Sequence, residues 1–501
     1  MDKRLVGVGG AVCVVLGMLT APAAEASTGL HVGSKLSVKV GAGRTVNVRL
    51  LPHATSRHHA VAPMLLRNGR PSGSELTAPA HGTRSSGGAS ADVGTAEPSS
   101  FSMRTNGLSQ ATSTCEAGCP QSDAQTAISP TAIVEVVDDA LAVYSTGGAA
   151  LSSVSLDAFY NTTDSLSRPR VLYDAQWSRW VVIAQDDLTG NTFLAASDNA
   201  DPTSTWYTVP LQWGDNADYP ILGMSQDAIF ITANHFDASN TYKYSSVAIY
   251  KKAWFYNHVA GFIPSFLVPF NTAPSVDSIG FGFKVYYLLS ADPAADTMTV
   301  HVILNAATQP SFKSKPPIAH AWNAPTSWAA QPGTSALIDP GDGRFEGPIN
   351  RSYNGHLWFV HTIDVAGFPT VEYGHVNGGN NTMHSATAYH ASSSSDFGGA
   401  ISATYDNPTV AWAYTDVFDG TPVTDVAQAR KSPFPAHLGG QPFSPTGGVS
   451  TTTVAYGSST SVSYDLSSNA CTVPPTFISA QYYDQSTGEW VTRFVHSTLT
   501  C

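Results

Sequence analysis

The stretch Pro169-Arg-Val-Leu-Tyr-Asp174, followed after a short turn by Arg179-Trp-Val-Val-Ile-Ala184, decides the fold of this chain. Both runs are rich in β-branched and aromatic residues, which favour strands, and polar turn residues separate them. The same strand–turn–strand unit returns, with changes, at 219–224 and 227–233. Further copies lie at 347–351 with 356–361, and at 401–406 with 409–414. A unit that recurs in this way predicts a repeat architecture built from strands.

From residue 130 onward the units recur at intervals of roughly 50 to 70 residues, about the length of a four-stranded antiparallel sheet with its loops. No window shows the period of an amphipathic helix. We therefore predict an all-β fold over residues 130–501, a β-propeller of seven four-stranded antiparallel blades, with six or eight as alternatives. Pairing an N-terminal with a C-terminal strand would cover the exposed edges, and runs 481–484 and 489–495 are the expected late strands.

The first 129 residues differ in character from this repeat region. Residues 1–26 show the basic start, apolar stretch and small-residue cleavage site of a signal peptide, so we expect a secreted, extracellular protein. Residues 27–70 contain two alternating runs around Gly41-Ala-Gly43, which predict a β-hairpin or a pro-segment. Residues 71–129 are rich in Ser, Gly and Ala and predict a disordered linker. Outside the signal, no apolar run approaches the roughly 18 residues of a membrane span.

The cysteines agree with export. Without Cys13 of the signal, Cys115, Cys119, Cys471 and Cys501 remain, an even number that suits an oxidising compartment. Three connectivities are possible, and proximity in the sequence favours Cys115–Cys119 and Cys471–Cys501. Free buried thiols are the alternative.

The charge of the chain excludes some partners. Charged residues make up only 12% of the chain, and the formal net charge is −12. The acidic excess lies in residues 130–501, whereas residues 27–129 are net basic. An acidic domain of this kind repels nucleic acid and anionic lipid. We expect a monomer that binds an extracellular protein or a glycan.

In propellers, the loops that enter the innermost strands gather at the mouth of the central channel. Polar and aromatic residues of those loops form our candidate binding face: Arg168, Trp213, Asp215, Asp218, Arg344, Glu346, Phe397 and Tyr456. A glycosidase would need two carboxylates that face each other across a sugar, and Glu346, Asp396 and Asp218 could supply them. A sialidase-like site would add an arginine cluster, for which Arg168, Arg170, Arg344 and Arg351 are candidates. Aspartate before a strand is also an ordinary turn residue.

Other catalytic patterns are absent from the sequence. There is no Gly-x-Ser-x-Gly elbow and no His-Glu-x-x-His motif. His356 and His361 are five residues apart on an expected turn and strand, so their side chains should face opposite sides, and a structural role is favoured. No organic cofactor is expected. Calcium is the one candidate cofactor, through oxygen ligands from Asp215, Asp218, Asp339 and Asp342.

Several local motifs carry a resemblance to a known family. They are Arg168-Pro-Arg-Val-Leu-Tyr-Asp174 with Arg179-Trp180, Ala200-Asp-Pro-Thr-Ser-Thr-Trp206, and Ala217-Asp-Tyr-Pro-Ile-Leu-Gly223 with Thr232-Ala-Asn234. With these motifs the chain resembles a group of exported bacterial β-propeller proteins, most of which have no assigned activity. It is also loosely similar to the dispase autolysis-inducing protein, which implies a secreted protease as a partner.

Two functional hypotheses follow. The first is a non-catalytic exported propeller that binds an extracellular macromolecule, such as a secreted protease, through its loop face; under it the chain is not an enzyme. The alternative is a glycoside hydrolase or sialidase-like enzyme that uses carboxylates at the mouth of the central channel.

Overall fold

The structure is a computed structural model of the chain. It describes residues 31–54, 100–113, 122–277, 285–404, 406–429, 437–438, 440–445, 447–450, 454–456, 459–464 and 475–498. All five cysteines, and with them both predicted disulfides, lie outside the described residues, as does the predicted signal peptide.

The described chain is all-β, as the sequence predicts. Helical structure is confined to α1 (Leu156–Tyr160), α2 (Lys252–Phe255) and a single 3-10 turn at Val48–Leu50. No described helix has the length and apolar character needed to cross a membrane.

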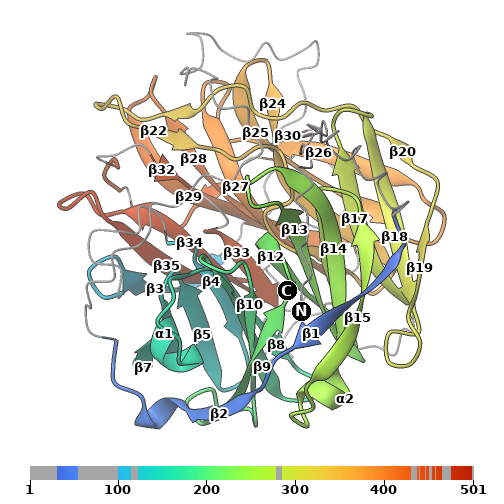
Figure 1. Ribbon diagram of the computed structural model, residues 1–501. Helices are drawn as coiled ribbons and strands as arrows, with labels where there is room; N and C mark the ends of the chain where they lie inside the picture. Colours follow the sequence, from blue (N-terminus) through green and yellow to red (C-terminus); the bar gives the residue numbers. More distant parts are fainter. Residues whose placement is uncertain are drawn as a thin grey trace, which may run out of the picture. The chain divides into compact units, whose positions relative to one another are not determined.

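Most strands pair in antiparallel groups of four along the sequence (Figure 1). The first three groups are β4 (Gln125–Ile128), β5 (Ala132–Val137), β6 (Ala140–Ser145) and β7 (Ala150–Ser155); β8 (Leu166–Asp174), β9 (Arg179–Asp186), β10 (Thr192–Ser197) and β11 (Thr205–Gln212); and β12 (Asn216–Met224), β13 (Ala228–Phe236), β14 (Tyr242–Lys251) and β15 (Gly261–Val268).

The next three groups repeat this order. They are β16 (Thr272–Asp277), β17 (Val285–Asp292), β18 (Thr297–Leu304) and β19 (Ser311–Ser314); β23 (Ile349–Arg351), β24 (His356–Val365), β25 (Phe368–Asn377) and β26 (Met383–Ala388); and β27 (Ser395–Thr404), β28 (Asn407–Asp416), β29 (Thr421–Ala429) and β31 (Gln441–Pro442).

The last group pairs an early strand with the C-terminal strands. Strands β33 (Ser461–Tyr464), β34 (Thr476–Tyr483) and β35 (Trp490–Thr498) pair in sequence, as expected for the late strands, and β3 (Ser100–Ser109) pairs with β35. Strand β3 corrects the prediction of a disordered linker over residues 71–129, a range that also contains the whole of β4. The local composition did not predict β3 because its partner strand is distant in the sequence.

Minor strands complete the fold. They are β20 (Ile318–Ala319), β21 (Ala329–Ala330), β22 (Leu337–Asp339), β30 (His437–Leu438) and β32 (Val454–Ala455). Strand β20 pairs with β18, and β22 pairs in parallel with β32.

The predicted hairpin at residues 27–70 is wrong in its pairing. Strands β1 (Lys35–Val40) and β2 (Arg44–Asn47) do form at the expected places, but they do not pair with each other. Strand β1 pairs with β15 and with the end of β11, and β2 pairs with β11. The edge of an outer strand exposes backbone N–H and C=O groups that have no partner. Strands β1 and β2 pair with such groups of β15 and β11 and so extend their sheets.

Large aromatic residues fill the spaces between the sheets. Each of Trp180, Trp206, Trp358, Trp412 and Trp490 is no more than 1% exposed and belongs to a hydrophobic cluster. Middle strands such as β13 are buried along their whole length, because both faces are covered. The recurring tryptophans are therefore core residues.

Candidate functional site

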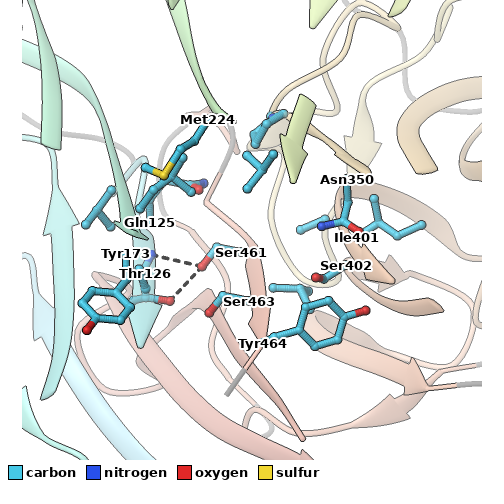
Figure 2. Close-up of a pocket in the computed structure, with 18 of the residues that line it drawn as sticks. Gln125, Thr126, Tyr173, Met224, Asn350, Ile401, Ser402, Ser461, Ser463 and Tyr464 are labelled. Atoms are coloured by element: carbon cyan, nitrogen blue, oxygen red, sulfur yellow. Dashed lines mark hydrogen bonds between the residues drawn. The ribbon is translucent and has the colours of Figure 1, made fainter. Parts of the chain in front are cut away.

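The first strands of the four-stranded groups surround one cavity of about 160 Å³. Residues of β4, β8, β12, β16, β23, β27 and β33 all line it. Figure 2 shows its wall, in which Thr126 and Ser461 share a hydrogen bond of 2.8 Å between their hydroxyl oxygens. Charged side chains line this wall as well: Asp174, Lys252, Asp277 and Glu346.

The direction of the first strands separates these charged residues into two ends. Strands β12, β16 and β23 run parallel to one another, as their registers show. Residues early in the first strands therefore gather at one end of the cavity, and residues late in them gather at the other. We call the first the entry end and the second the exit end.

Backbone bulges shape the entry end. The registers of β8, β12 and β27 shift near their starts, between Ser167 and Arg170, between Asp218 and Ile221, and between Phe397 and Ala400. Arg168 and Tyr219 lie inside these shifts with φ angles of 50° and 61°. Left-handed backbone at residues other than glycine is costly, and a bulge re-aims a side chain. Local geometry therefore holds Arg168 and Tyr219 in fixed directions.

Arginines of the entry end stack on an aromatic ring. The guanidinium carbons of Arg168 and Arg344 each lie 4.9 Å from the centre of the Tyr219 ring. Arg168 Nε is 3.0 Å from Asp218 Oδ1, and Arg344 Nε is 2.7 Å from Asp342 Oδ1. Each guanidinium is thus neutralised by a carboxylate and positioned by the ring.

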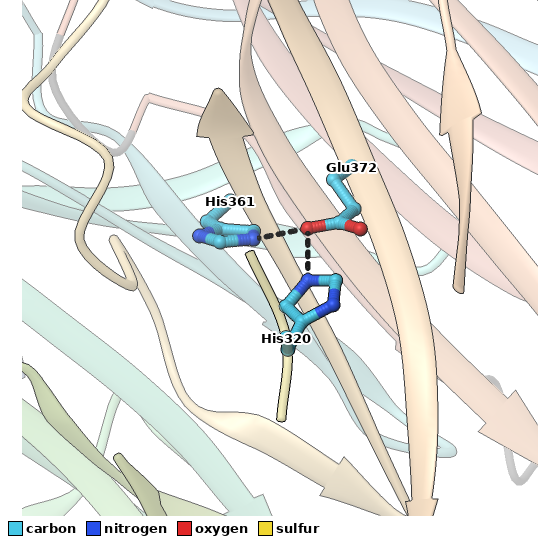
Figure 3. Close-up of side chains that lie close together, drawn as sticks. All are labelled: His320, His361 and Glu372. Carbon is cyan, nitrogen blue, oxygen red and sulfur yellow. Dashed lines mark hydrogen bonds and ion pairs between the residues drawn. The ribbon is translucent and has the colours of Figure 1, made fainter. Parts of the chain in front are cut away.

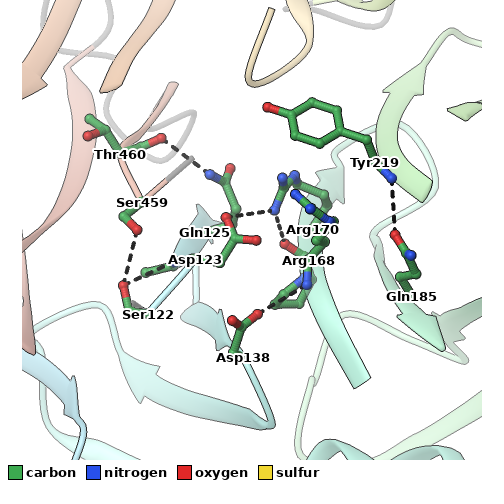
Figure 4. Close-up of polar contacts among 12 residues, drawn as sticks. Ser122, Asp123, Gln125, Asp138, Arg168, Arg170, Gln185, Tyr219, Ser459 and Thr460 are labelled. Carbon is green, nitrogen blue, oxygen red and sulfur yellow. Dashed lines mark hydrogen bonds and ion pairs between the residues drawn. The ribbon is translucent and has the colours of Figure 1, made fainter. Parts of the chain in front are cut away.

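A further ion pair, between Arg170 and Asp123, lies beside this stack (Figure 4). Arg170 donates through Nη1 to the carbonyl of Pro169, and the same nitrogen is 3.6 Å from Asp123 Oδ1. The backbone N–H of Arg168 donates to Asp138 Oδ1 at 3.1 Å. Burial raises the pKa of Asp138 well above its usual range, and the carboxylates Asp123 and Asp187 raise it further. The entry end therefore holds more carboxyl groups than guanidinium groups.

Glu346 stands out among these carboxyl groups. It is 8% exposed, and its Oε2 atom is buried without a hydrogen-bond partner among the described residues. Burial raises the pKa of Glu346 well above its usual range, the nearby carboxylates Asp342, Asp339 and Asp123 add to this, and Arg170 opposes it. Burial of this kind favours the protonated form of a carboxyl group, the form that can donate a proton.

The exit end has different chemistry. Lys252 Nζ is 2.6 Å from Asp174 Oδ2, and the Tyr256 hydroxyl donates to the same oxygen at 2.7 Å. Asp277 has both carboxyl oxygens buried without hydrogen-bond partners in the described structure. Burial raises the pKa of Asp277 to about 7, against the opposing charges of Arg351 and Lys252.

The structure brings together only part of the predicted binding face. Arg168, Asp218, Arg344 and Glu346 meet at the entry end, with Asp339 and Asp342 beside them. Trp213 and Asp215 do not join them. Trp213 lines a separate hollow next to β1, and Asp215 contacts two other residues of that hollow, His235 and Tyr244, as well as Lys243.

Two further members of the predicted face are core residues. Phe397 is fully buried and packs edge-on against Tyr456, with ring centres 5.1 Å apart. The Tyr456 hydroxyl donates to Asp425 Oδ1 at 2.9 Å. Both residues belong to the same hydrophobic core cluster.

Asp396, a catalytic candidate from the sequence, is a buried residue whose carboxylate has partners of its own. Its side chain is fully buried and accepts hydrogen bonds from the Trp412 indole, the Ser394 hydroxyl and the His390 backbone. We therefore place Asp396 behind Glu346 among the candidates for acid chemistry.

The calcium site stays a prediction, and the structure gives the partners of three of its four proposed aspartates. Asp215 and Asp218 face different partners, His235 and Arg168, and Asp342 is held by Arg344. Within the described ranges, two clusters of three His, Asp or Glu side chains could share a metal ion, and neither contains any of the four proposed aspartates.

Sequence reasoning missed several charged residues in and around this cavity. Asp123 lies in the Ser-rich segment that composition assigns to a linker, so no motif marks it. Asp277 and Lys252 were also missed. One pattern in the sequence could have identified Asp277. Asp174 and Asp277 are each the last residue of the first strand in their four-stranded group, and an alignment of the repeats would show this.

No protein-family model matches the sequence, and no curated protein matches it. Solved structures do match. A thermostable family-43 glycoside hydrolase shows 8% identity over 66% of this chain and 89% of its own, with a TM-score of 0.30. Exo-β-1,3-galactanase of Phanerochaete chrysosporium shows 11% identity over 68% and 95%, with a TM-score of 0.30. Trypanosoma rangeli sialidase shows 9% identity over 56% of this chain and only 54% of its own, with a TM-score of 0.28.

These neighbours correct our first functional hypothesis. They are named as glycoside hydrolases and sialidases, and so they overturn the expectation of a non-catalytic protein that binds a protease, and with it the expectation that the chain is not an enzyme. At such low identity and TM-score we carry no residue and no substrate across from them. The chemistry has to be argued from the cavity of this chain.

Proposed function

We propose that this protein is a glycoside hydrolase with its active site at the entry end of the central cavity, and that its four-stranded groups are the blades of a seven-bladed β-propeller. Support for the propeller comes from the cavity, which the first strand of every group lines. In a propeller, residues from different blades converge at one mouth of the channel.

Glu346 carries the proposal. Glycoside hydrolysis needs a carboxylic acid that is protonated at the working pH and protonates the leaving oxygen. The raised pKa and the unpartnered, buried Oε2 of Glu346 suit that role. When the glycosidic bond breaks, the proton of Glu346 passes to the leaving oxygen and positive charge develops on the sugar ring.

A second carboxylate has to stabilise that charge and attack the ring or activate water. We assign this role to Asp123, because its charge acts on Glu346 and it faces Arg170 across 3.6 Å. Asp218, the candidate from the sequence, acts instead as the partner of Arg168.

The charge balance of the entry end favours neutral glycosides over sialosides. A sialoside carries a carboxylate, which a sialidase binds with unpaired arginines. Here Arg168, Arg170 and Arg344 each already face an aspartate. Adding a substrate carboxylate to these pairs would place like charges close together in a buried site.

The test is hydrolysis by the purified protein. Release of nitrophenol from a panel of neutral nitrophenyl glycosides, and of reducing sugar from neutral polysaccharides, should exceed the rate with sialosides. Glu346→Gln should abolish this activity, and Glu489→Gln, the same change in a surface turn, should leave it intact. Failure of the protein to hydrolyse any member of either panel, or full activity of Glu346→Gln, would refute the proposal.

A further inference from the structure

Two histidines and a glutamate form a compact cluster outside the cavity (Figure 3). His361 on β24 and Glu372 on β25 are direct cross-strand partners, so their side chains share one face of the sheet. His320 comes from the segment just after β20. The Nε2 atoms of His361 and His320 lie 2.8 Å and 2.9 Å from the same oxygen, Glu372 Oε2.

The hydrogen bonds of His361 determine which nitrogen faces the glutamate as a ligand. Its Nδ1 is 3.0 Å from the carbonyl oxygen of Gly343, which can only accept, so Nδ1 carries a proton. In a neutral imidazole, Nε2 then presents a lone pair toward Glu372. A ring proton donated to a backbone carbonyl is the usual outer-shell contact of a histidine that binds a metal.

The cluster lies in apolar surroundings. His361 is 1% exposed and lies edge-on to the Trp322 ring, with centres 4.6 Å apart. In the tautomer set by Gly343, the Nε2 lone pair of His361 faces the Glu372 oxygen at 2.8 Å, and a divalent cation at this place could bind both atoms.

We propose that His320, His361 and Glu372 bind a divalent cation of the zinc class, with water completing the coordination. Two imidazoles and one carboxylate are an established ligand set for zinc, and imidazole ligands favour Zn²⁺ and related transition metals over Ca²⁺. The ion would attach the His320 segment to β24 and β25. Through the Gly343 carbonyl, it would also support the loop that carries Arg344 and Glu346.

A second histidine cluster provides the control. His356 and Asp406 also lie close to His375, but both ring nitrogens of His356 already have partners. His356 Nδ1 is 2.7 Å from Asp406 Oδ1, and its Nε2 is 3.2 Å from the Asn377 side-chain nitrogen. A neutral His356 that donates from Nδ1 to Asp406 and accepts at Nε2 from Asn377 satisfies both of these contacts without a metal.

The experiment measures metal binding and requires no enzymatic activity. The full-length protein is stripped with EDTA, reloaded with Zn²⁺ or Co²⁺, gel-filtered, and measured by elemental analysis and visible absorption. We expect one cation per chain, intense Co²⁺ bands of a tetrahedral site, and a higher melting temperature with Zn²⁺. Glu372→Gln and the partly exposed His320→Gln should lose all three effects, whereas His356→Gln should keep them.

Each outcome decides the proposal. Retention of no metal by the wild type, without Co²⁺ bands, would overturn it, and this result does not depend on whether the variants fold. Wild-type binding by folded Glu372→Gln and His320→Gln would also overturn it, because the metal would then lie elsewhere. Absence of glycosidase activity would leave the metal site standing.

Discussion

Replacing Asp277 by asparagine tests how burial acts on the charged cavity wall. The Asp277 side chain is 5% exposed, and both of its oxygens lack hydrogen-bond partners among the described residues. Burial raises its pKa from 3.8 to about 7, although Arg351 and Lys252 oppose the change. Because one pKa unit corresponds to about 1.4 kcal/mol, the ionised carboxylate should destabilise the folded state by about 4 kcal/mol at pH 8.

The sign of the effect follows from the direction of the pKa change. A carboxyl group with a raised folded-state pKa contributes its full stability below about pH 4, and this contribution is lost as the pH rises through about 7. Asparagine resembles the protonated form at every pH. The Asp277→Asn variant should therefore match the wild type near pH 4 and exceed its unfolding free energy by about 4 kcal/mol at pH 8.

The assay is equilibrium urea unfolding followed by tryptophan fluorescence at pH 4, 6 and 8. The control is Asp296→Asn, the same change at an exposed turn residue, which should show no pH-dependent difference. A variant that is less stable than the wild type at pH 8 would refute the reasoning. It would mean that attraction between Asp277 and Arg351, 3.8 Å apart, outweighs the desolvation of the carboxylate.

Three further predictions concern the site and its scaffold. Glu346→Gln should lower glycosidase activity by about 10² to 10⁴-fold, and the activity of the wild type should fall as the pH rises through the raised pKa of Glu346, because the ionised form cannot donate a proton; a pH–rate profile without this falling limb would contradict the assignment. Asp396→Asn should lower stability by about 1 to 3 kcal/mol, since its buried hydrogen bonds are disrupted, yet leave the kcat of the folded protein unchanged; a loss of kcat in folded enzyme would move Asp396 up among the catalytic candidates. Deletion of residues 1–113 should remove β1, β2 and β3 and expose the edges of β11, β15 and β35. The shortened protein should therefore aggregate, as measured by light scattering, and a stable monomer would show that these three strands are dispensable.

The strands of the repeat were predictable because their cause is local. Alternating or continuous β-branched and aromatic runs, bounded by turn residues, predict strands wherever they occur. The two runs quoted first became β8 and β9, paired as a hairpin. The recurring tryptophans such as Trp180 and Trp412 were correctly interpreted as packing residues, since large apolar side chains are needed wherever two sheets stack.

Pairing over long distances was not predictable in the same way. Strand β3 comes from a segment whose composition indicates a linker, and only the edge of β35 makes it a strand. The runs around Gly41-Ala-Gly43 became strands β1 and β2 but found partners in β11 and β15 instead of each other. In each case a distant sheet edge decided the outcome, and no local pattern encodes such an edge.

The same distinction between local pattern and distant contact applies to the candidate site. The sequence by itself determined the strands, the acidic character of the domain, and Glu346 as the glutamate best placed for acid chemistry. Only the tertiary structure decided that Asp123 and Arg170 stand beside Glu346, whereas Asp396 and Tyr456 are core residues. The reason is physical: a carboxyl group's pKa and its partners depend on burial and on charges that other strands of the fold bring close. Those charges are neighbours in space and far apart along the chain.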